Sequence, residues 1–563
     1  MIPLVVLAAA AFIVGIVVGA GPDNPGAERF LDAWEQGDYE AMHAELTTDA
    51  QDRYSQTAFE RSYQSATDTA TIESIQVGES REEGDAVVAP VSFDTNLFGT
   101  LNGELSLPVS DGKVAWEPHL VYPGLANDER LSRRTRAPPR APILAADRTP
   151  LASGPAAARV DASGASAVVG EVGTPTRSQA EVQTRRGFPP GSLTGVSGLE
   201  QAFDEQLAGK PGGQLLAVSS KSDTEVGTGR VLASTEPQKG KAVRTTLDPA
   251  LQESAVTALG STYGGVAVLN AKTGEVLALS GLAYSAPQPP GSTFKVITAT
   301  GALDAGIVSL DDTFPVESSN SEIGREIANA HDELCGGTFE QSFAQSCNTV
   351  FAPLGAELGG EKLVETAKKF GFNSPPTLFD DEATEVVSPP QSTIPDELAS
   401  SVEAGESAIG QGQVLATPLE MASVAQTIAN GGVRSPTPIA RSPDLQADAE
   451  PVEVTSKETA ATMRQLMIEV VNSGTGVAAA LPGVQVAGKT GTAELGPKAL
   501  EPGQELGPGE EPELETDAWF TSFAPAGDPK LAVAVMVVNS DGDGGTVAAP
   551  IARQVLATGL GVG

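Results

Sequence analysis

The chain has 563 residues, of which 73 are Asp or Glu and 35 are Lys or Arg, so its formal net charge is -38. Hydrophobic residues make up 40% of the sequence, which is typical of a largely globular protein with room for several domains. A surface this acidic repels phosphate backbones, and nucleic acid is therefore excluded as a partner.

An apolar run occupies residues 2–20, which are 19 consecutive apolar or small residues. A helix of this length crosses the hydrocarbon core of a bilayer, and we therefore predict a transmembrane anchor over residues 1–22. The chain beyond the anchor is then expected on the outer side of the cell membrane. A cleaved signal peptide is the alternative, because Val18, Gly19 and Ala20 resemble a small-residue cleavage site.

Residues 23–125 change from a helical to a strand pattern. Phe30, Leu31 and Trp34 recur at helical spacing, whereas the apolar residues from position 87 onward alternate with polar ones in short runs. These patterns predict a small α+β domain in which helices precede a curled antiparallel sheet.

Residues 126–241 are rich in Arg, Pro, Gly and Ser, and they contain only short β-like segments. This composition predicts an extended, loosely built domain. Apolar content and regular elements return from residue 242 onward, so residues 242–563 are expected to form a second, larger α+β domain.

The larger domain shows strand patterns at both ends. Residues 266–269 and 275–279 flank a Lys-Thr-Gly turn and predict a hairpin, while residues 531–538 predict a buried strand near the end. Strands at both ends with helices between them are typical of an α+β domain whose central sheet is closed by C-terminal strands. The segment 495–517 is dense in Gly, Pro and Glu and is predicted to be a solvated loop.

Ser292 and Lys295 form an S-x-x-K pattern at the spacing of one helical turn. Residues three apart on a helix lie on one face, so the lysine amine can approach the serine hydroxyl. A serine is a poor nucleophile until a neighbouring base takes its proton, and a partly desolvated lysine can act as that base near neutral pH. The pair therefore predicts a serine nucleophile activated by lysine.

Two further motifs follow in the order that this chemistry requires. Ser346 and Asn348 form an S-x-N pattern, and Lys489-Thr490-Gly491-Thr492 contains K-T-G. On a strand that borders a cleft, Gly491 would let a substrate backbone lie close. S-x-x-K alone occurs by chance in many chains, but the three motifs in this order favour a serine acyltransferase.

No metal site and no cofactor site are evident in the sequence. The three histidines, His43, His119 and His331, are scattered, and with only two cysteines they form no metal-ligand pattern. We therefore expect neither a metal nor another cofactor.

Residues 483–490 also match G-x-x-x-x-G-K-T, the phosphate-binding loop of nucleotide hydrolases. Such a loop must follow a strand and open a helix. Val484 and Val486 alternate as a strand that leads into Lys489, and Gly491 opens a helix poorly. The pattern therefore argues against a nucleotide hydrolase.

The three catalytic motifs resemble those of the monofunctional class B penicillin-binding proteins, and the resemblance covers almost the whole chain after the apolar run. Further segments resemble the family's transpeptidase domain, its non-catalytic pedestal and the end of a nuclear-transport-factor-2-like domain. In that order these segments are Thr246-Leu247-Asp248, Thr273-Gly274-Glu275, Gly410-Gln411-Gly412 and Thr417-Pro418-Leu419; Gly198-Leu199-Glu200; and Trp116-Glu117-Pro118-His119-Leu120.

The resemblance implies a multidomain α+β fold. It comprises an N-terminal membrane helix (1–22), a nuclear-transport-factor-2-like domain (23–125), an extended pedestal or dimerisation domain (126–241) and a C-terminal serine β-lactamase/transpeptidase-like domain with a central antiparallel sheet (242–563). The extra N-terminal domain is similar to that of the low-affinity, methicillin-resistance type branch. No glycosyltransferase domain has room before residue 242.

The resemblance also implies the catalytic roles. Ser292 would be the nucleophile of a peptidoglycan D,D-transpeptidase, and Lys295 would be its base. Ser346 would relay a proton between the lysine and the leaving amine. The backbone N–H groups of Ser292 and Thr492 would form the oxyanion hole.

The remaining motif residues would bind the substrate. Asn348 would hydrogen-bond the substrate peptide. Lys489, Thr490 and Thr492, with Gly491 between them, would hold its terminal carboxylate through charge-assisted hydrogen bonds.

The implied partners are peptidoglycan stem peptides, β-lactam antibiotics, the membrane through one N-terminal helix, and a glycosyltransferase of the cell-wall machinery. A β-lactam-hydrolysing or β-lactam-sensing serine protein shares the motifs and stays open as an alternative, although no family-style glutamate for activating water is evident. A catalytically silent cell-wall scaffold is the alternative of another class. Against it, all the catalytic residue types are intact.

Cys335 and Cys347 are candidates for a disulfide, because an exported chain can form and keep one. A capping box at Thr338 predicts a short helix between the two cysteines. The two glycines after Cys335 allow the chain to fold back along that helix and bring the sulfur atoms within reach. Two buried free thiols remain the alternative.

Overall fold

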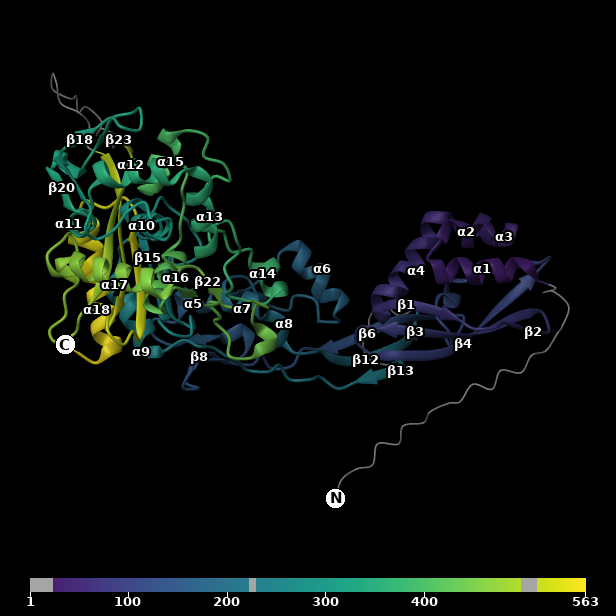
Figure 1. The fold of residues 1–563 in the computed structure, drawn as a ribbon. Coiled ribbons are helices and arrows are strands. Elements are labelled where there is room, and N and C mark those ends of the chain that lie inside the picture. Colours follow the sequence, from purple (N-terminus) through teal and green to yellow (C-terminus); the bar gives the residue numbers. More distant parts are fainter. Residues whose placement is uncertain (1–23, 222–228, 498–513, 563) are drawn as a thin grey trace, which may run out of the picture. The chain divides into compact units, whose positions relative to one another are not determined.

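The computed structural model describes residues 24–221, 229–497 and 514–562 (Figure 1). The predicted membrane helix over residues 1–22 lies outside these ranges. Within them, no helix combines the length and the apolar character that crossing a membrane requires.

The chain divides into two compact units. Unit 1 contains the described residues up to Pro138 together with Arg177–Ser192 and Lys210–Gln238, and unit 2 contains the other described residues. The segment 126–241, predicted as one domain, thus contributes to both units.

Unit 1 opens with helices that lie along one side of an antiparallel sheet (Figure 1). The helices are α1 (Pro25–Gln36), α2 (Tyr39–Ala44), α3 (Thr48–Arg53) and α4 (Gln56–Ala70). The sheet has the order β1-β3-β4-β5, with β2 paired to β3. Its strands are β1 (Ile72–Val77), β2 (Arg81–Glu83), β3 (Ala86–Thr95), β4 (Gly99–Ser110) and β5 (Lys113–Val114). Helices before sheet confirm the predicted small α+β fold.

Aromatic side chains form the core between these helices and their sheet. Trp34 and Phe59 are buried, and Trp116 Nε1 donates a hydrogen bond to the Tyr63 hydroxyl at 3.1 Å. The longest of the helices, α4, begins where the Ser55 side chain caps its first turn. Burial of each large ring stabilises the unit by roughly 2–3 kcal/mol, so this unit has a core of its own.

The rest of unit 1 includes an antiparallel ribbon and a further helix. The ribbon has the order β13-β12-β6. Its elements are β6 (Glu129–Arg136), β12 (Gly212–Ser219) and β13 (Arg230–Thr235), and the helix is α6 (Arg177–Arg185). β12 is one of the short β-like segments expected between residues 126 and 241.

Unit 2 begins with a pedestal of short elements. Its strands are β7 (Ile143–Leu144), β8 (Pro150–Ser153), β9 (Val160–Asp161), β10 (Val172–Gly173), β11 (Thr194–Gly195) and β14 (Val243–Arg244), and its helices are α5 (Ser166–Val169), α7 (Gly198–Ala202) and α8 (Asp204–Ala208). The Glu200 carboxylate is fully buried and accepts hydrogen bonds from Arg140 Nε and Arg159 Nε, each at 2.6 Å. This ion cluster joins segments that are far apart in the sequence and fixes the pedestal.

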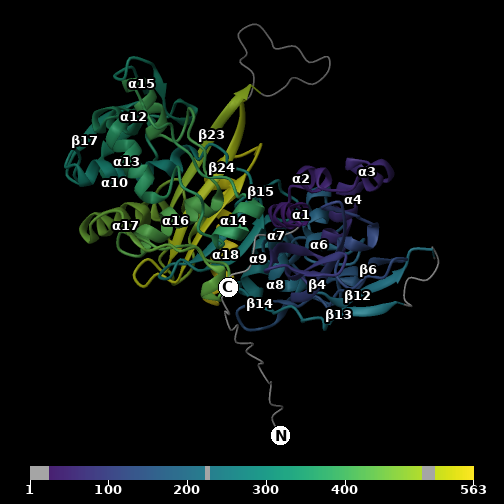
Figure 2. The same ribbon diagram turned by 90° about the vertical axis from the view of Figure 1, so that its right-hand side faces the viewer.

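A five-stranded antiparallel sheet forms the centre of the large domain, in the order β16-β15-β25-β24-β23 (Figure 2). Its strands are β15 (Gly264–Asn270), β16 (Val276–Gly281), β23 (Ala487–Pro497), β24 (Leu514–Ala524) and β25 (Leu531–Val537). The predicted hairpin is β15 with β16, and the predicted buried C-terminal strand is β25, so both predictions are confirmed. β23 lies at one edge of the sheet.

Helices cover both faces of this sheet. Side chains alternate along a strand, so Val266 and Val268 pack with α9 (Pro249–Leu259) and α18 (Ala549–Leu560) on one face. Ala267 and Leu269 belong to the other core, which contains α16 (Pro418–Ala429) and α17 (Lys457–Asn472). The other elements around this second core are η3 (Gly291–Phe294), α10 (Lys295–Asp304), β17 (Thr313–Glu317), β18 (Ser319–Asn320), β19 (Ile327–Ala328), β20 (Cys335–Thr338), α11 (Phe339–Ala344), α12 (Asn348–Leu358), α13 (Gly360–Phe370), α14 (Asp381–Val387), α15 (Ser401–Ala408), β21 (Val433–Arg434) and β22 (Val452–Glu453).

The prediction of a solvated loop over residues 495–517 was wrong at both ends. β23 continues to Pro497 and β24 starts at Leu514, and these two residues pair with each other. A register shift between Glu494 and Gly496 accommodates the glycine, and an edge strand tolerates a proline because no neighbour needs its missing N–H. The middle of the predicted loop, residues 498–513, lies outside the described residues.

Candidate active site

The S-x-x-K pattern lies where the 3₁₀ turn η3 passes directly into α10. Ser292 is in the turn, and Lys295 is the first residue of the helix. Thr293 Oγ1 closes the turn with a hydrogen bond to the Pro290 carbonyl at 2.7 Å. The serine and the lysine therefore belong to one continuous helical segment, as their spacing predicts.

The Lys295 side chain is fully buried and reaches the S-x-N segment. Its Nζ donates to Asn348 Oδ1 at 2.7 Å, to the Ser346 carbonyl at 2.7 Å and to the Ser346 hydroxyl at 3.3 Å. The Lys295 backbone N–H donates to the Ser292 carbonyl, but within the described residues no hydrogen bond joins the Lys295 amine to the Ser292 hydroxyl. Catalytic hydrogen bonds often tighten only when substrate binds, so this geometry keeps Lys295 as the candidate base for the serine one turn away.

A second lysine approaches the same hydroxyl from the edge of the sheet. Lys489 lies on β23 and is also fully buried. Its Nζ donates to Ser346 Oγ at 2.8 Å and to the Thr490 carbonyl at 3.1 Å. The Ser346 oxygen therefore accepts hydrogen bonds from both lysines, which leaves its own proton available to a third group.

Burial lowers the pKa of both lysines. Burial and the charge of Lys489 hold the pKa of Lys295 well below 10.5, and burial lowers the pKa of Lys489 to about 7. In the part of the chain that the structure describes, the hydrogen-bond partners of both amines are all neutral oxygens. Two unpaired ammonium groups this close repel each other. The charge of Lys489 therefore adds to the effect of burial on Lys295, and both lower its pKa and favour its neutral form.

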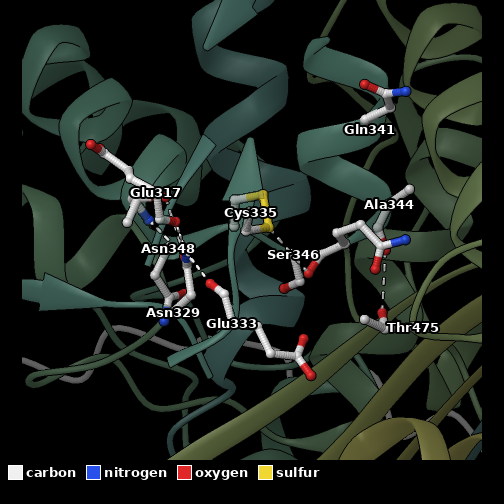
Figure 3. The surroundings of a disulfide bond; sticks show 12 residues. Glu317, Asn329, Glu333, Cys335, Gln341, Ala344, Ser346, Asn348 and Thr475 are labelled. Carbon is white, nitrogen blue, oxygen red and sulfur yellow. Dashed lines mark hydrogen bonds between the residues drawn. A yellow bond between two sulfur atoms is a disulfide. The ribbon is translucent and has the colours of Figure 1, made fainter. Parts of the chain in front are cut away.

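Ser346 lies in the short loop between α11 and α12 with φ of 63°, a left-handed conformation that side-chain-bearing residues rarely adopt. The predicted capping box at Thr338 is present at the start of α11. The disulfide between Cys335 and Cys347 is also present, with Cα atoms 5.4 Å apart, so the open choice between a bond and free thiols is resolved. Figure 3 shows this bridge beside Ser346.

The K-T-G strand lies directly against the serine turn. A side chain at Gly491 would come within 2.7 Å of the Pro290 carbonyl oxygen, and one at Gly291 within 2.6 Å of the Thr492 carbonyl oxygen. The Gly410 carbonyl accepts a hydrogen bond from Gly291 N at 3.0 Å. The sequence interpretation assigned Gly491 to the approach of a substrate backbone, whereas in the structure it is the protein's own serine turn that comes close.

Sequence reasoning missed two residues that hold the threonines of the last motif. Thr475 Oγ1 shares a hydrogen bond with Thr490 Oγ1, and Gly544 N donates to Thr492 Oγ1 at 3.4 Å. Neither residue belongs to a recognisable pattern. Their roles depend on tertiary contacts between the last motif and segments distant from it.

The three motifs thus meet at one place, and the structure excludes the competing phosphate-loop pattern. Lys489 is followed by more of strand β23 and not by a helix, so the loop geometry that cradles phosphates is absent at residues 483–490. Among the described residues, no group of three or more His, Cys, Asp or Glu is arranged to hold a metal ion.

Three family models match successive parts of the chain. Residues 23–129 match the NTF2-like N-terminal transpeptidase domain, and residues 136–245 match the penicillin-binding protein dimerisation domain. Residues 264–557 match the penicillin binding protein transpeptidase domain.

The curated relatives include two proteins named peptidoglycan D,D-transpeptidase PbpA. The one from Mycobacterium tuberculosis is 33% identical over 386 residues, which are 57% of this chain and 73% of the relative. The one from Mycolicibacterium smegmatis is 33% identical over 433 residues, which are 65% of this chain and 79% of the relative.

Solved structures show the same similarity. PBPA from M. tuberculosis is 28% identical, covers 75% of this chain and 99% of its own, and has a TM-score of 0.56. The ceftriaxone acyl-enzyme complex of the same penicillin-binding protein A is 27% identical over 75% of this chain and 98% of that one, with a TM-score of 0.57.

Proposed function

This chain belongs to the class B penicillin-binding proteins, and from that premise we propose that Ser292 is the nucleophile through which it acts as a peptidoglycan D,D-transpeptidase. The enzyme cross-links stem peptides through an acyl-enzyme, and β-lactams acylate the same serine. One observation carries the assignment of residues. The Ser346 hydroxyl lies between two buried lysines, which have no carboxylate partner among the described residues, and one of them is a helical turn from Ser292.

In the first half of the reaction, Ser292 Oγ attacks the carbonyl before the terminal D-alanine and forms an ester. Neutral Lys295 takes the serine proton. The bond to the D-alanine nitrogen breaks, and that nitrogen receives a proton through Ser346, which accepts a hydrogen bond from Lys295 and still has its own proton to give. The backbone N–H groups of Ser292 and Thr492 stabilise the negative charge that develops on the attacked oxygen.

In the second half, the amine of another stem peptide attacks the ester and gives a proton to Ser346. The bond between the acyl carbon and Ser292 Oγ breaks, and Lys295 returns a proton to that oxygen, which frees Ser292. A β-lactam enters through the same attack. Its ring C–N bond breaks, but the amine stays tethered to the acyl group.

Lys489, Thr490 and Thr492 are the proposed carboxylate site, with Gly491 allowing the strand and the serine turn to meet. A bound carboxylate favours the charged form of Lys489 and raises its pKa. A charged Lys489 lowers the pKa of Lys295 in turn. Substrate binding therefore favours a charged Lys489 beside a neutral Lys295. Asn348, which accepts from Lys295, is positioned to orient the peptide beside it.

Hydrolysis of the acyl-enzyme, the alternative activity, needs a carboxylate that activates water. The hydrogen-bond partners of Lys295, Ser346 and Lys489 within the described residues include no carboxylate. This favours transfer to an amine over hydrolysis by a β-lactamase route.

We further propose a single-pass anchor over residues 1–22, with the catalytic domain outside the cell membrane and a glycosyltransferase of the cell-wall machinery as partner. The 19-residue apolar run supports the anchor. Our proposed domain limits are 23–125, 126–241 and 242–563.

A transpeptidation assay tests the function. The full chain in detergent is given a peptide ending in D-alanyl-D-alanine and an amine acceptor, and the released D-alanine and the new amide product are both quantified. We expect equal amounts of the two, and neither with Ser292→Ala. Release of D-alanine without any amide product would identify a hydrolase, and product from Ser292→Ala would contradict the assignment of the nucleophile.

A further inference from the structure

The segment 317–335 is attached to the start of α12 by a disulfide and by several hydrogen bonds. Figure 3 shows the disulfide, which joins Cys335 to Cys347. Asn329 bonds Thr349, and Asn320 Nδ2 donates to the Thr349 carbonyl at 2.7 Å. Asn348, whose side chain meets Lys295 Nζ, lies between Cys347 and Thr349 in the sequence. The geometry of the S-x-N motif therefore depends on a segment that lies before it in the sequence.

Asn329 is 6% exposed and uses both ends of its amide. Its Oδ1 accepts from Thr349 N at 3.1 Å and from Thr349 Oγ1 at 3.3 Å. Its Nδ2 donates to the carbonyls of Glu317 at 2.8 Å and Glu333 at 3.1 Å. Asn329 thus closes its own segment with one end of the side chain and binds α12 with the other.

The bond to Thr349 N supplies a helix cap. The first N–H groups of a helix have no partner inside it and are normally satisfied by a side chain at the N-cap position. The N-cap residue of α12 is Cys347, which makes no such bond because its sulfur is in the disulfide. Asn329, 20 residues away in sequence, provides the missing acceptor.

The capped turn carries a motif residue. Asn348 is the first residue of α12, and its Oδ1 accepts from Lys295 Nζ at 2.7 Å. Its Nδ2 donates to the carbonyl of Ala328, the neighbour of Asn329, at 2.9 Å. Loss of the cap is expected to loosen the first turn of α12 and to shift Asn348 relative to the base. A displacement of about 1 Å at a reacting group costs roughly 100-fold in rate.

We propose that Asn329 is a positioning residue for acylation, which caps α12 from outside the helix and thereby holds Asn348 against Lys295. This inference rests on the proposed function, because its consequence is a rate of acylation at Ser292. The cap on α12 does not depend on the proposed function, and hydrogen exchange measures it separately.

The test compares Asn329→Ala, Asn329→Asp and a matched control in the full chain. Asn329→Asp keeps an acceptor for Thr349 N but loses the two donated bonds. The control is Asn373→Ala, which removes a partly buried asparagine that bonds the backbone N and O of Ile394 at 2.9 and 2.8 Å elsewhere in the same domain. For each variant we measure acylation by a fluorescent penicillin, resolved into initial binding and the acylation step, and hydrogen exchange of peptides from the start of α12.

We expect Asn329→Ala to slow the acylation step about 10- to 100-fold with little change in initial binding, and to speed amide exchange in the first turn of α12. Asn329→Asp should recover part of both, because it keeps the acceptor for Thr349 N but places a carboxylate against the carbonyls of Glu317 and Glu333. Asn373→Ala should affect neither. Unchanged exchange in Asn329→Ala overturns the cap. Faster exchange with a wild-type acylation step, or a loss no larger than in Asn373→Ala, overturns the positioning role. Wild-type protein that no penicillin labels contradicts the proposed function instead, while the exchange comparison still decides the cap.

Discussion

Two groups of buried charged side chains in unit 2 are built in opposite ways. In the pedestal, the Glu200 carboxylate lies between Arg140 and Arg159, and each charge has a partner of opposite sign. In the active site, Lys295 and Lys489 are equally buried but bond to neutral oxygens within the described residues.

The difference separates a structural cluster from a reactive one. A buried charge with an opposite partner keeps its charge, and losing the partner is costly. A buried amine without one gives up its proton more easily, and so becomes a base at neutral pH. The presence or absence of a counter-charge at equal burial therefore predicts which substitutions reduce activity and which reduce stability.

The largest expected effect is on activity. Lys295→Met removes the proposed base but keeps an apolar chain of similar length, so acylation by penicillin should fall by about 10²- to 10⁴-fold. The midpoint of thermal unfolding should change little, because the lost hydrogen bonds are offset by removal of an unpaired buried amine. Labelling kinetics measure the loss of acylation, and a thermal scan of the same sample measures the midpoint of unfolding. Acylation within threefold of wild type would show that another group is the base.

The pedestal should behave in the opposite way. Glu200→Gln leaves the buried Arg159 without its anion and leaves Arg140 with Asp204 alone, and we expect the free energy of unfolding to fall by about 3–5 kcal/mol. Acylation by the fraction that remains folded should stay near the wild-type rate. Urea unfolding followed by fluorescence measures the loss, and Glu385→Gln, an exposed position on α14, is the control with an expected change within about 0.5 kcal/mol. A loss of stability equal to that of the control would show that the ion cluster around Glu200 does not stabilise the pedestal.

The third prediction concerns pH. The pKa of Lys489 is about 7 in the folded protein and 10.5 in the unfolded chain. Between these pH values the amine is protonated in the unfolded chain but largely neutral in the folded protein. The free energy of unfolding therefore rises with pH between about 7 and 10.5. Below about pH 7 the buried amine is charged, and its burial destabilises the folded protein by the full amount. We expect the stability of Lys489→Met to exceed the wild-type value most at pH 6 and least at pH 10. Chemical denaturation of both proteins across that range checks the trend, and a difference that grows with pH would contradict the lowered pKa.

The smallest expected effect completes the comparison with an exposed pair. Lys272 Nζ lies 2.8 Å from Asp528 Oδ1, but the two side chains are 62% and 71% exposed. Solvent and salt screen such a pair, so Lys272→Ala should change the free energy of unfolding by less than about 1 kcal/mol. Denaturation at low and high salt measures it. A cost comparable to that of Glu200→Gln would show that burial is not what separates these groups.

The predictable part of the site was the part encoded by short-range geometry. Ser292 and Lys295 lie one turn apart, so their proximity follows from helix formation alone. The capping box at Thr338 followed from residues within a short stretch of chain. The sequence left the disulfide open against two free thiols, and the structure shows the bond. The hairpin β15–β16 followed from alternation and a turn signal.

The unpredicted part depends on tertiary contacts. Thr475 and Gly544 meet the last motif only because distant segments pack beside β23, and Asn329 reaches α12 across the fold. The ends of β23 and β24 were misjudged because local composition favours a turn at Gly496 and Pro497, whereas cross-strand pairing extends the ladder through them. Spacing along the chain carries no information about such pairings.

Peptide mapping of the full chain after reaction with benzylpenicillin tests the assignment of the nucleophile. We expect one penicilloyl adduct per chain, on Ser292, and no adduct in Ser292→Ala. An adduct on another residue, or labelling of Ser292→Ala at the wild-type rate, would contradict it.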